Sequence, residues 1–404
     1  MPGLESTTAH FSQSLMINCA KGSRMRGNEK VLIVGGGIAG LAAATGLCRL
    51  GIRPTIVERT REFGAVGAGI VLSVNAMAML RMLGLGDAAL EAGRILENSE
   101  LTNAKGQRLF GMNFADLAPD FGPTITIHRA TLHKVLLSGC QDAKLHANLW
   151  VDHLHDLGES VEATFSDGRT KHFDHVIGAD GLRSQTREQI FGRTDTLYSG
   201  YTCWRFVVES PPGLDRMQEM WGRGRRLGLV PLAGGRLYCY ATANAKAGVA
   251  DPDEGRIERF KKLFRAFSGF APAILEQLTR PEQLIHNDLE EMPKHPWYKG
   301  RVLLIGDAAH ATTPNMGQGA AMALEDAGIL CKMLEGDASF EKVIPAFAVR
   351  RESRVRFIVD QSRRFGRLGQ LENSLLRSFR NGVMRMMPQR LTSAGAVRAA
   401  AAEI

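Results

Sequence analysis

Apolar and polar positions occur in blocks near the start of the chain. Residues 30–34 form a short apolar run, residues 35–40 are rich in glycine, and residues 38–50 are mainly apolar with small side chains. A second apolar run follows at residues 54–57. Short continuous apolar runs are typical of strands buried on both faces, and the longer segment predicts a helix. The pattern therefore predicts a strand, a tight turn, a helix and a parallel strand.

Later segments extend this pattern. Two further apolar runs, at residues 173–178 and 300–305, predict more strands of the same sheet. Between residues 195 and 292 strand-like segments with polar interruptions predict a mixed sheet. We predict a disordered extension at 1–29, a nucleotide-binding domain at 30–96, 126–196 and 285–342, a substrate domain at 97–125 and 197–284, and C-terminal helices at 343–404.

The composition is that of an ordinary globular protein. The 404 residues are 44% hydrophobic and 23% charged, which excludes fibrous and low-complexity classes. The six cysteines are scattered without metal-ligand spacing, so we expect reduced thiols, no bound metal and a cytoplasmic protein. We expect no transmembrane segment, because the most apolar stretch, residues 31–50, contains a glycine turn and Arg49.

The net charge of +8 is concentrated at the C-terminal end. Residues 342–404 hold 13 lysines and arginines against four acidic residues. Such a segment can contact nucleic acid or anionic lipid, but its apolar positions at helical spacing favour a packed pair of amphipathic helices with a solvated basic face. These positions are Val355, Ile358, Val359, Leu371, Leu375 and Leu376. We therefore expect no nucleic-acid partner.

The glycine-rich turn carries the first chemical signal. Gly35 permits a tight turn, Gly37 lets the backbone approach a pyrophosphate, and Gly40 lets helix and strand pack closely. Free N–H groups at the start of the following helix favour the same anion. Glu58 ends the second strand, where an acid accepts hydrogen bonds from an adenosine ribose. The unit predicts a bound dinucleotide and leaves FAD and NAD both open.

Two later segments favour FAD. Asp180 and Asp307 each follow a predicted strand. Taken alone, the Asp180 segment could also be a hairpin-like turn before a basic helix, whereas Asp307 stands where an acid can bind a ribose or ribityl hydroxyl. After Asp307, Pro314 and the run Gly317-Gln318-Gly319 open a helix. Its free N–H groups would attract the negative charge on the pyrimidine edge of a reduced flavin.

These segments resemble the three fingerprints of the single-component flavoprotein aromatic hydroxylases, the family that includes para-hydroxybenzoate hydroxylase, salicylate hydroxylase, bacterial urate hydroxylase and zeaxanthin epoxidase. The resemblance extends from Val31 to about Pro388. It implies an α/β fold of the para-hydroxybenzoate hydroxylase type, an FAD-binding dinucleotide fold with an inserted mixed β-sheet substrate domain and C-terminal helices. The implied cofactor-binding residues are Gly35, Gly37, Ile38, Ala39, Gly40, Glu58, Arg59, Arg129, Asp180, Asp307, Pro314, Gly317, Gln318 and Gly319.

The activity implied by the resemblance is that of an FAD-dependent monooxygenase. NADH or NADPH reduces FAD, dioxygen is captured as a flavin hydroperoxide, and one oxygen atom enters a small aromatic or heteroaromatic substrate. The flavin is then the catalytic centre, and we expect a monomer or a homodimer. Two alternatives stay open: a flavin-dependent epoxidase of an isoprenoid-like alkene, and a non-enzymatic FAD-binding redox protein.

The candidates for substrate binding come mainly from the strand-rich part. Arg226 and Tyr238 match a substrate-binding arginine and tyrosine of the urate hydroxylase pattern, and Arg205 is a second possible anchor for an anionic or phenolic ring. Cys203 stands where that pattern has asparagine, and Asn315 where it has an aspartate proposed to assist deprotonation. Because asparagine cannot act as a general base, urate is a poor first expectation.

Overall fold

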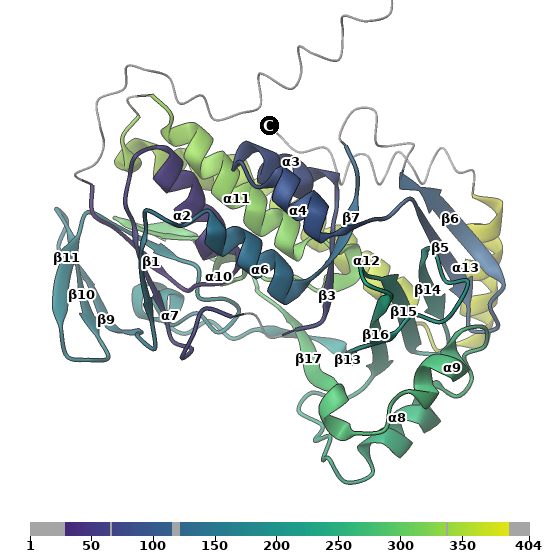
Figure 1. Ribbon diagram of the computed structural model, residues 1–404. Coiled ribbons are helices and arrows are strands. Elements are labelled where there is room, and N and C mark those ends of the chain that lie inside the picture. The colour runs from purple at the N-terminus through teal and green to yellow at the C-terminus, as the bar shows by residue number, and fades with distance from the viewer. Residues whose placement is uncertain (1–28, 65–66, 115–121, 337, 388–404) are drawn as a thin grey trace, which may run out of the picture.

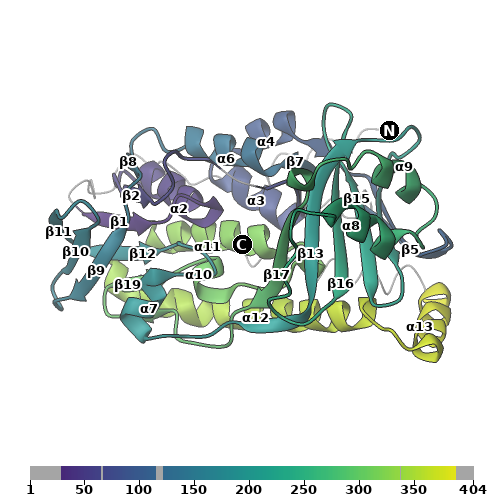
Figure 2. The ribbon, with the colours of Figure 1, turned by 90° about the horizontal axis from the view of Figure 1, so that it is seen from below.

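The computed structural model describes residues 29–64, 67–114, 122–336 and 338–387. A parallel sheet with its helices lies at one end and a larger mixed sheet at the other, and the long helix α12 (Phe340–Gly369) runs along both (Figure 2). The predicted extension lies outside the described residues apart from Glu29, as does the last part of the predicted C-terminal helices, residues 388–404.

The first sheet has six strands in the order β18, β19, β12, β1, β2, β8. The strands are β1 (Val31–Val34), β2 (Thr55–Glu58), β8 (Lys144–Ala147), β12 (His175–Gly178), β18 (Tyr298–Lys299) and β19 (Val302–Leu304). All pairs are parallel except β18 with β19. Every residue of β1 and β19 is buried, which explains their continuous apolar sequences. The predicted strands and the α/β class are confirmed.

Helices surround this sheet (Figure 1). They are α2 (Ile38–Arg49), α3 (Val74–Met82), α4 (Gly86–Ala92), α6 (Arg129–Ser138), α7 (Gln185–Phe191), α10 (Asp307–His310) and α11 (Gly319–Leu334). Helices α2 and α11 pack against each other, and the largest hydrophobic cluster joins them to β1 and α3. This core fixes the starts of α2 and α11 in space.

Two three-stranded sheets lie beside the parallel sheet. One runs β11, β10, β9 and the other β3, β7, β4. Their strands are β3 (Gly69–Leu72), β4 (Arg94–Ile95), β7 (Ile125–His128), β9 (Val151–Asp156), β10 (Val161–Phe165) and β11 (Thr170–Phe173).

The largest sheet has seven strands in the order β17, β13, β16, β15, β14, β5, β6. They are β5 (Asn98–Asn103), β6 (Arg108–Asn113), β13 (Leu197–Glu209), β14 (Met217–Trp221), β15 (Arg225–Pro231), β16 (Arg236–Asn244) and β17 (Ile285–Glu291). Only β14 and β5 pair in parallel, so the sheet is mixed, as predicted. The predicted boundary at residue 285 is wrong, because β17 pairs with β13 in this sheet rather than joining the parallel one.

Helices complete the far end of the molecule. A hydrophobic cluster joins α8 (Arg256–Phe264) and α9 (Ala271–Glu276) to one face of the seven-stranded sheet. After α12 the chain turns into α13 (Ser374–Met386), which contacts β6. Among the described residues no helix has the length and apolar character needed to cross a membrane.

Candidate active site

The glycine-rich turn between β1 and α2 has a shape that only glycine permits at two positions. Gly35 has φ +107°, and a Cβ there would lie 2.5 Å from the carbonyl oxygen of Ala179. A Cβ on Gly40 would lie 2.0 Å from the Gly35 oxygen. A Cβ on Gly37 would meet no atom within 4 Å, so the start of α2 faces open space. Since α2 has no side-chain cap and no acidic residue in its first turn, its first N–H groups can receive an anion.

Two side chains hold this turn. The Glu58 carboxylate accepts the Gly36 N–H at 2.8 Å and the Thr60 N–H at 2.9 Å, and retains acceptor capacity for a ribose. The buried His133, on α6, places Nε2 2.7 Å from the Gly36 carbonyl oxygen. His133 was not among the predicted site residues, because its partner is a backbone carbonyl distant in sequence.

Asp307 begins α10 directly after the parallel strand β19. Its side chain is exposed and has no hydrogen bond or ion pair with another described residue. The preceding Gly306 packs against Ala39, the second residue of α2, and donates its N–H to Asp326 Oδ2 at 2.8 Å. Among the described residues the Asp307 carboxylate is thus exposed and unpaired, while Ala39 and Asp326 hold the backbone of the turn.

Asp326 belongs to a buried ionic network beneath this turn. Its carboxylate lies 2.6 Å from His310 Nε2 and 2.8 Å from Arg351 Nε, and Arg351 also pairs with Glu325 at 2.7 Å. Arg354 joins Glu325 at 2.9 Å. Burial alone would raise the pKa of Asp326, but His310 and Arg351 lower it to about 2. The expected solvated basic face of residues 342–404 is therefore wrong for Arg351 and Arg354, which are buried in ion pairs.

The start of α11 is the second open helix end. A Cβ on Gly317 or Gly319 would meet no atom within 4 Å. Between them, Gln318 is buried and bonded to Asn75 at 2.9 Å and Ser73 at 3.0 Å, so its side chain is part of the frame. Pro314, which opens the short 3₁₀ helix η3 (Pro314–Met316), is exposed.

The other predicted cofactor residues differ in their surroundings. Asp180 accepts the Ser184 hydroxyl at 2.5 Å and the Thr186 N–H at 3.0 Å, so its carboxylate organises the start of α7. Arg59 and Arg129 are exposed, and neither forms an ion pair with a described residue. Ile38 is the first residue of α2.

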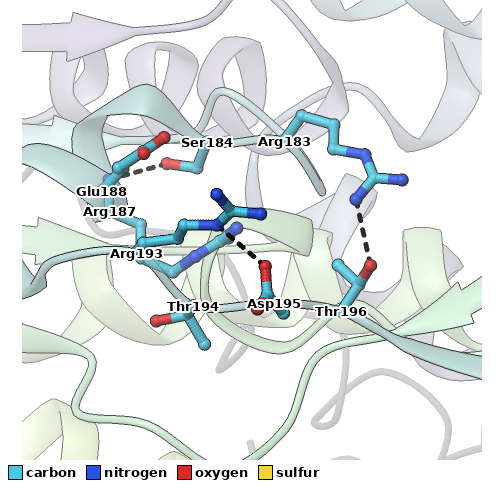
Figure 3. Close-up of a pocket in the computed structure, with 8 residues that line it drawn as sticks. All are labelled: Arg183, Ser184, Arg187, Glu188, Arg193, Thr194, Asp195 and Thr196. Atoms are coloured by element: carbon cyan, nitrogen blue, oxygen red, sulfur yellow. Dashed lines mark hydrogen bonds and ion pairs between the residues drawn. The ribbon is translucent and has the colours of Figure 1, made fainter.

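A polar cleft of about 370 Å³ follows the Asp180 turn (Figure 3). Its lining is Arg183, Ser184, Arg187, Glu188, Arg193, Thr194, Asp195 and Thr196. Arg183 donates to Thr196 at 3.0 Å and pairs with Glu290 at 2.5 Å, and Arg193 pairs with Asp195 at 3.0 Å. The cleft therefore offers two exposed arginines that are already paired, whereas Arg187 is buried and donates to the carbonyls of Ala308 and Leu182.

Strand alternation brings the substrate candidates onto one face of the seven-stranded sheet. Register pairs Arg226 with Thr242 and Cys203 with Thr242, and it pairs Tyr238 with both Val207 and Val230. The face thus carries Cys203, Arg205, Glu219, Trp221, Arg226, Tyr238, Tyr240 and Thr242. The alternate positions form the apolar cluster under α8 and α9.

Arg226 is not a free anchor. Its side chain is 2% exposed and lies 3.4 Å from Glu219, whose other oxygen accepts the Tyr240 hydroxyl at 2.8 Å. Arg226 also donates to Asn315 Oδ1 at 2.6 Å and to the Thr242 hydroxyl at 3.2 Å. Glu219 was not predicted as a site residue, because its partnership depends on the pairing of β14 with β15.

Asn315 joins this face to the η3 turn. Besides accepting from Arg226, its amide donates to the Tyr201 hydroxyl and to Thr313 Oγ1, both at 2.8 Å, and to the Ser362 carbonyl at 2.9 Å. An amide with all its groups engaged positions other residues and does not abstract a proton.

The remaining candidates for substrate binding, Arg205, Tyr238 and Cys203, have fewer polar partners than Arg226. Arg205 hydrogen-bonds to Asn287 and Tyr238 and has no acidic partner among the described residues. Burial raises the pKa of Tyr238 well above its usual range, and the ring lies against Gly69 of β3. Cys203 is buried, and desolvation raises the pKa of its thiol. Arg205 and Tyr238 thus form a hydrogen-bonded pair on the same face of the sheet as Arg226.

Comparison with known proteins extends this picture. A family model described as FAD binding domain matches residues 28–361. The chain is 37% identical over 370 residues to the aurachin C monooxygenase/isomerase of Stigmatella aurantiaca, covering 90% of this chain and 95% of that protein. It is 36% identical over 363 residues to the 2-heptyl-3-hydroxy-4(1H)-quinolone synthase of Pseudomonas aeruginosa, covering 89% and 94%. A crystal structure of Klebsiella pneumoniae HpxO complexed with FAD and uric acid matches with a TM-score of 0.85 at 25% identity, covering 93% and 97%.

Proposed function

The chain belongs to the FAD-binding domain family and is an FAD-dependent monooxygenase, and on this premise we propose that it hydroxylates a bicyclic nitrogen heteroaromatic ring of the 4(1H)-quinolone type. The predicted resemblance to the FAD-dependent aromatic hydroxylases is confirmed, and the non-enzymatic alternative is set aside. NADH or NADPH supplies the electrons, and O₂ supplies the inserted oxygen atom. The cytoplasmic location and the monomer or homodimer stay predictions.

The two open helix ends and two carboxylates fit FAD. The N–H groups at the start of α2 would hold the pyrophosphate, and Glu58 the adenosine ribose. The exposed Asp307 would accept the ribityl hydroxyls, and the space at Gly317 and Gly319 would admit the flat ring. When bound, FAD supplies the electron transfer and oxygen activation.

The cleft after Asp180 suits the electron donor. Two exposed arginines line it, Arg183 and Arg193, and phosphate groups of NADH or NADPH would replace their present carboxylate and hydroxyl partners. The cleft begins at the turn that also packs against Gly35, so the donor would lie beside the flavin seat.

The FAD assignment has a direct test. Replacing Asp307 with alanine removes an exposed carboxylate with no internal partner, so the fold should be kept while FAD affinity falls roughly tenfold or more. Asp195→Ala, another exposed carboxylate, is the matched control. Flavin content after purification and the FAD Kd of the apoprotein give the result, and an unchanged Kd in Asp307→Ala would contradict this role.

The buried Arg226–Glu219 pair carries the substrate proposal. With the Glu219 carboxylate engaged by Arg226 and by the Tyr240 hydroxyl, and with Asn315 unable to take a proton, the described residues of this face offer no free base for a phenol that must be deprotonated. A 4(1H)-quinolone needs none, because its ring nitrogen already donates electron density to the carbon beside the carbonyl. Positive charge then develops on the ring nitrogen as that carbon attacks, while Arg205 and Tyr238 would hold the ring in place through hydrogen bonds to its carbonyl oxygen. The quinolone named for the Pseudomonas relative belongs to this class.

A substrate panel tests this proposal. NADH and NADPH oxidation by the FAD-loaded protein would be followed with 2-alkyl-4(1H)-quinolones, hydroxybenzoates, hydroxypyridines and urate, with product masses recorded. We expect quinolones to stimulate oxidation and gain one oxygen atom, and Arg205→Gln to raise their KM roughly tenfold. Arg216→Gln, at an exposed arginine just before β14, should leave KM unchanged. Preference for hydroxybenzoates or urate would contradict the substrate class.

A further inference from the structure

Helix α13 presents an apolar face that none of the described residues covers. Leu375, Phe379 and Met386 are 79%, 74% and 84% exposed. They occupy positions i, i+4 and i+11 of the helix, which fall on one stripe at 100° per residue, and Leu376 and Val383 border that stripe. The expected packed helix pair is therefore wrong for Leu375 and Leu376, which face outward.

The opposite side of α13 is firmly attached to the seven-stranded sheet. The Arg380 guanidinium lies 4.8 Å from the centre of the Trp221 ring and donates to the Leu368 carbonyl at 2.7 Å. Met384 packs in the cluster that contains Trp221, and Arg385 donates to Gln107 at 3.0 Å. The outward direction of the apolar stripe is thus fixed by specific contacts. Figure 2 shows α13 at the far end of the molecule, beyond the end of α12.

Charge selects the partner for this face. Helix α13 contains no acidic residue, and its Arg377 and Arg380 lie on the side away from the stripe. The exposed arginines are Arg385 on α13 and Arg364 and Arg367 in the last turns of α12. Two copies of the face packed together would bring these arginines close to one another, which opposes a homodimer. Anionic headgroups beside an apolar layer match both properties, as in helices that lie in a membrane interface.

We propose that α13 is a peripheral membrane-binding helix, whose apolar stripe enters the headgroup region of an anionic lipid surface while the exposed Arg364, Arg367 and Arg385 contact lipid phosphates. The contact lies on the surface and does not span the bilayer. It also lies close to the candidate substrate face, since Trp221, beneath Arg380, donates to Glu219 at 2.9 Å and Glu219 holds Arg226. An apolar substrate dissolved in lipid would enter near its binding face.

Vesicle flotation of the FAD-loaded full chain tests the proposal. Vesicles of phosphatidylcholine with one third phosphatidylglycerol would be compared with pure phosphatidylcholine vesicles. We expect binding to the anionic vesicles, weaker binding in high salt, and a loss of roughly tenfold or more in the partition coefficient for Leu375→Ser/Phe379→Ser. The control is Val349→Ser, because Val349 on α12 is an isolated apolar side chain of similar exposure, 76%. Flavin content and Tm should stay unchanged in both variants.

Four outcomes would overturn it. Retention of the wild-type chain by anionic vesicles at only the level of neutral ones would contradict the proposal, and so would a loss of binding in Val349→Ser as strong as in the double variant. A concentration-dependent dimer that Leu375→Ser/Phe379→Ser dissociates would assign the stripe to a second copy of the chain. Vesicle binding only by a chain ending at Met387 would assign the stripe to the segment 388–404 as its natural cover.

Discussion

The FAD cradle and the candidate substrate face are built in different ways. The candidate cradle is made of backbone from two short segments, one at the start of α2 and one at the start of α11. Gly35 and Gly40 shape the first of them. The substrate face is made of side chains from β13, β14, β15 and β16, and Arg226 joins it to Asn315, which lies 89 residues further along the chain. A backbone site follows from local spacing, whereas a side-chain site exists only once the strands have found their register.

The two regions also differ in how charge is buried. Behind the cradle, two carboxylates share two arginines and a histidine in a network that is almost wholly buried. On the substrate face a single pair, Arg226 with Glu219, is reinforced by neutral hydroxyl and amide groups. Damage to the first region should therefore appear in stability, and damage to the second in kinetics.

The largest expected effect is on the buried network. Asp326→Asn leaves His310 without its carboxylate and Arg351 with Glu325 alone, and removing one partner from a buried ion pair typically costs about 3–5 kcal/mol of unfolding free energy. Thermal and denaturant unfolding would measure this cost. The exposed Asp195→Asn is the control and should leave Tm unchanged. Equal Tm values for the two variants would contradict the structural role of Asp326.

The lowered pKa of Asp326 leads to a prediction about how the free energy of unfolding changes in acid. Because His310 and Arg351 hold the pKa of Asp326 at about 2, below its unfolded value, its contribution is complete above about pH 4. It should be lost as the pH falls toward 2. Asp326→Asn should therefore unfold with a flatter pH dependence between pH 4 and 2 than the wild-type chain.

A smaller effect is expected from the glycine turn. Gly35→Ala puts a Cβ 2.5 Å from a carbonyl oxygen at φ +107°, which should cost about 1–3 kcal/mol and reduce FAD binding. Gly37→Ala places its Cβ in open space, so the apoprotein should keep its Tm while FAD affinity falls. If both variants lost stability equally, the cradle would not have the shape described.

On the substrate face, Glu219→Gln should act on kinetics. It leaves the buried Arg226 charge without its carboxylate and disturbs the Tyr240 hydroxyl, so kcat/KM should fall roughly tenfold while flavin content is kept. Glu100→Gln, on the neighbouring β5, serves as the control. Loss of FAD in parallel with kcat/KM would show that the two regions are not separable.

The smallest expected effect is that of pH on kcat/KM through the two buried tyrosines. Burial raises the pKa of both Tyr238 and Tyr240, with Glu219 adding to the shift at Tyr240, so both phenols stay protonated through ordinary working pH. We expect kcat/KM to change by less than about twofold between pH 8 and pH 10 through these groups. A tyrosine-dependent step in this interval, absent in Tyr240→Phe, would contradict this expectation.

The sequence predicted the local features well. The strand, glycine turn and helix around Gly35, the acid at Glu58 and the turn after Asp307 all occur where the pattern placed them. The spacing could not show that Arg226 is paired with a carboxylate, because only the pairing of β14 with β15 brings Glu219 next to Arg226. The buried network was missed for a related reason: Arg351 and Arg354 lie in a basic segment, and only the packing of α12 on α11 shows that they are internal.

Labelling with ¹⁸O₂ tests the central proposal most directly. The FAD-loaded protein would be supplied with NADH or NADPH and a 2-alkyl-4(1H)-quinolone under ¹⁸O₂, and the product analysed by mass spectrometry. We expect one labelled oxygen atom in the product, as a hydroxyl group on the ring, in amounts that match the NAD(P)H consumed. Consumption of NAD(P)H that yields only hydrogen peroxide, with no label in the product of any panel compound, would contradict a monooxygenase acting on a heteroaromatic ring.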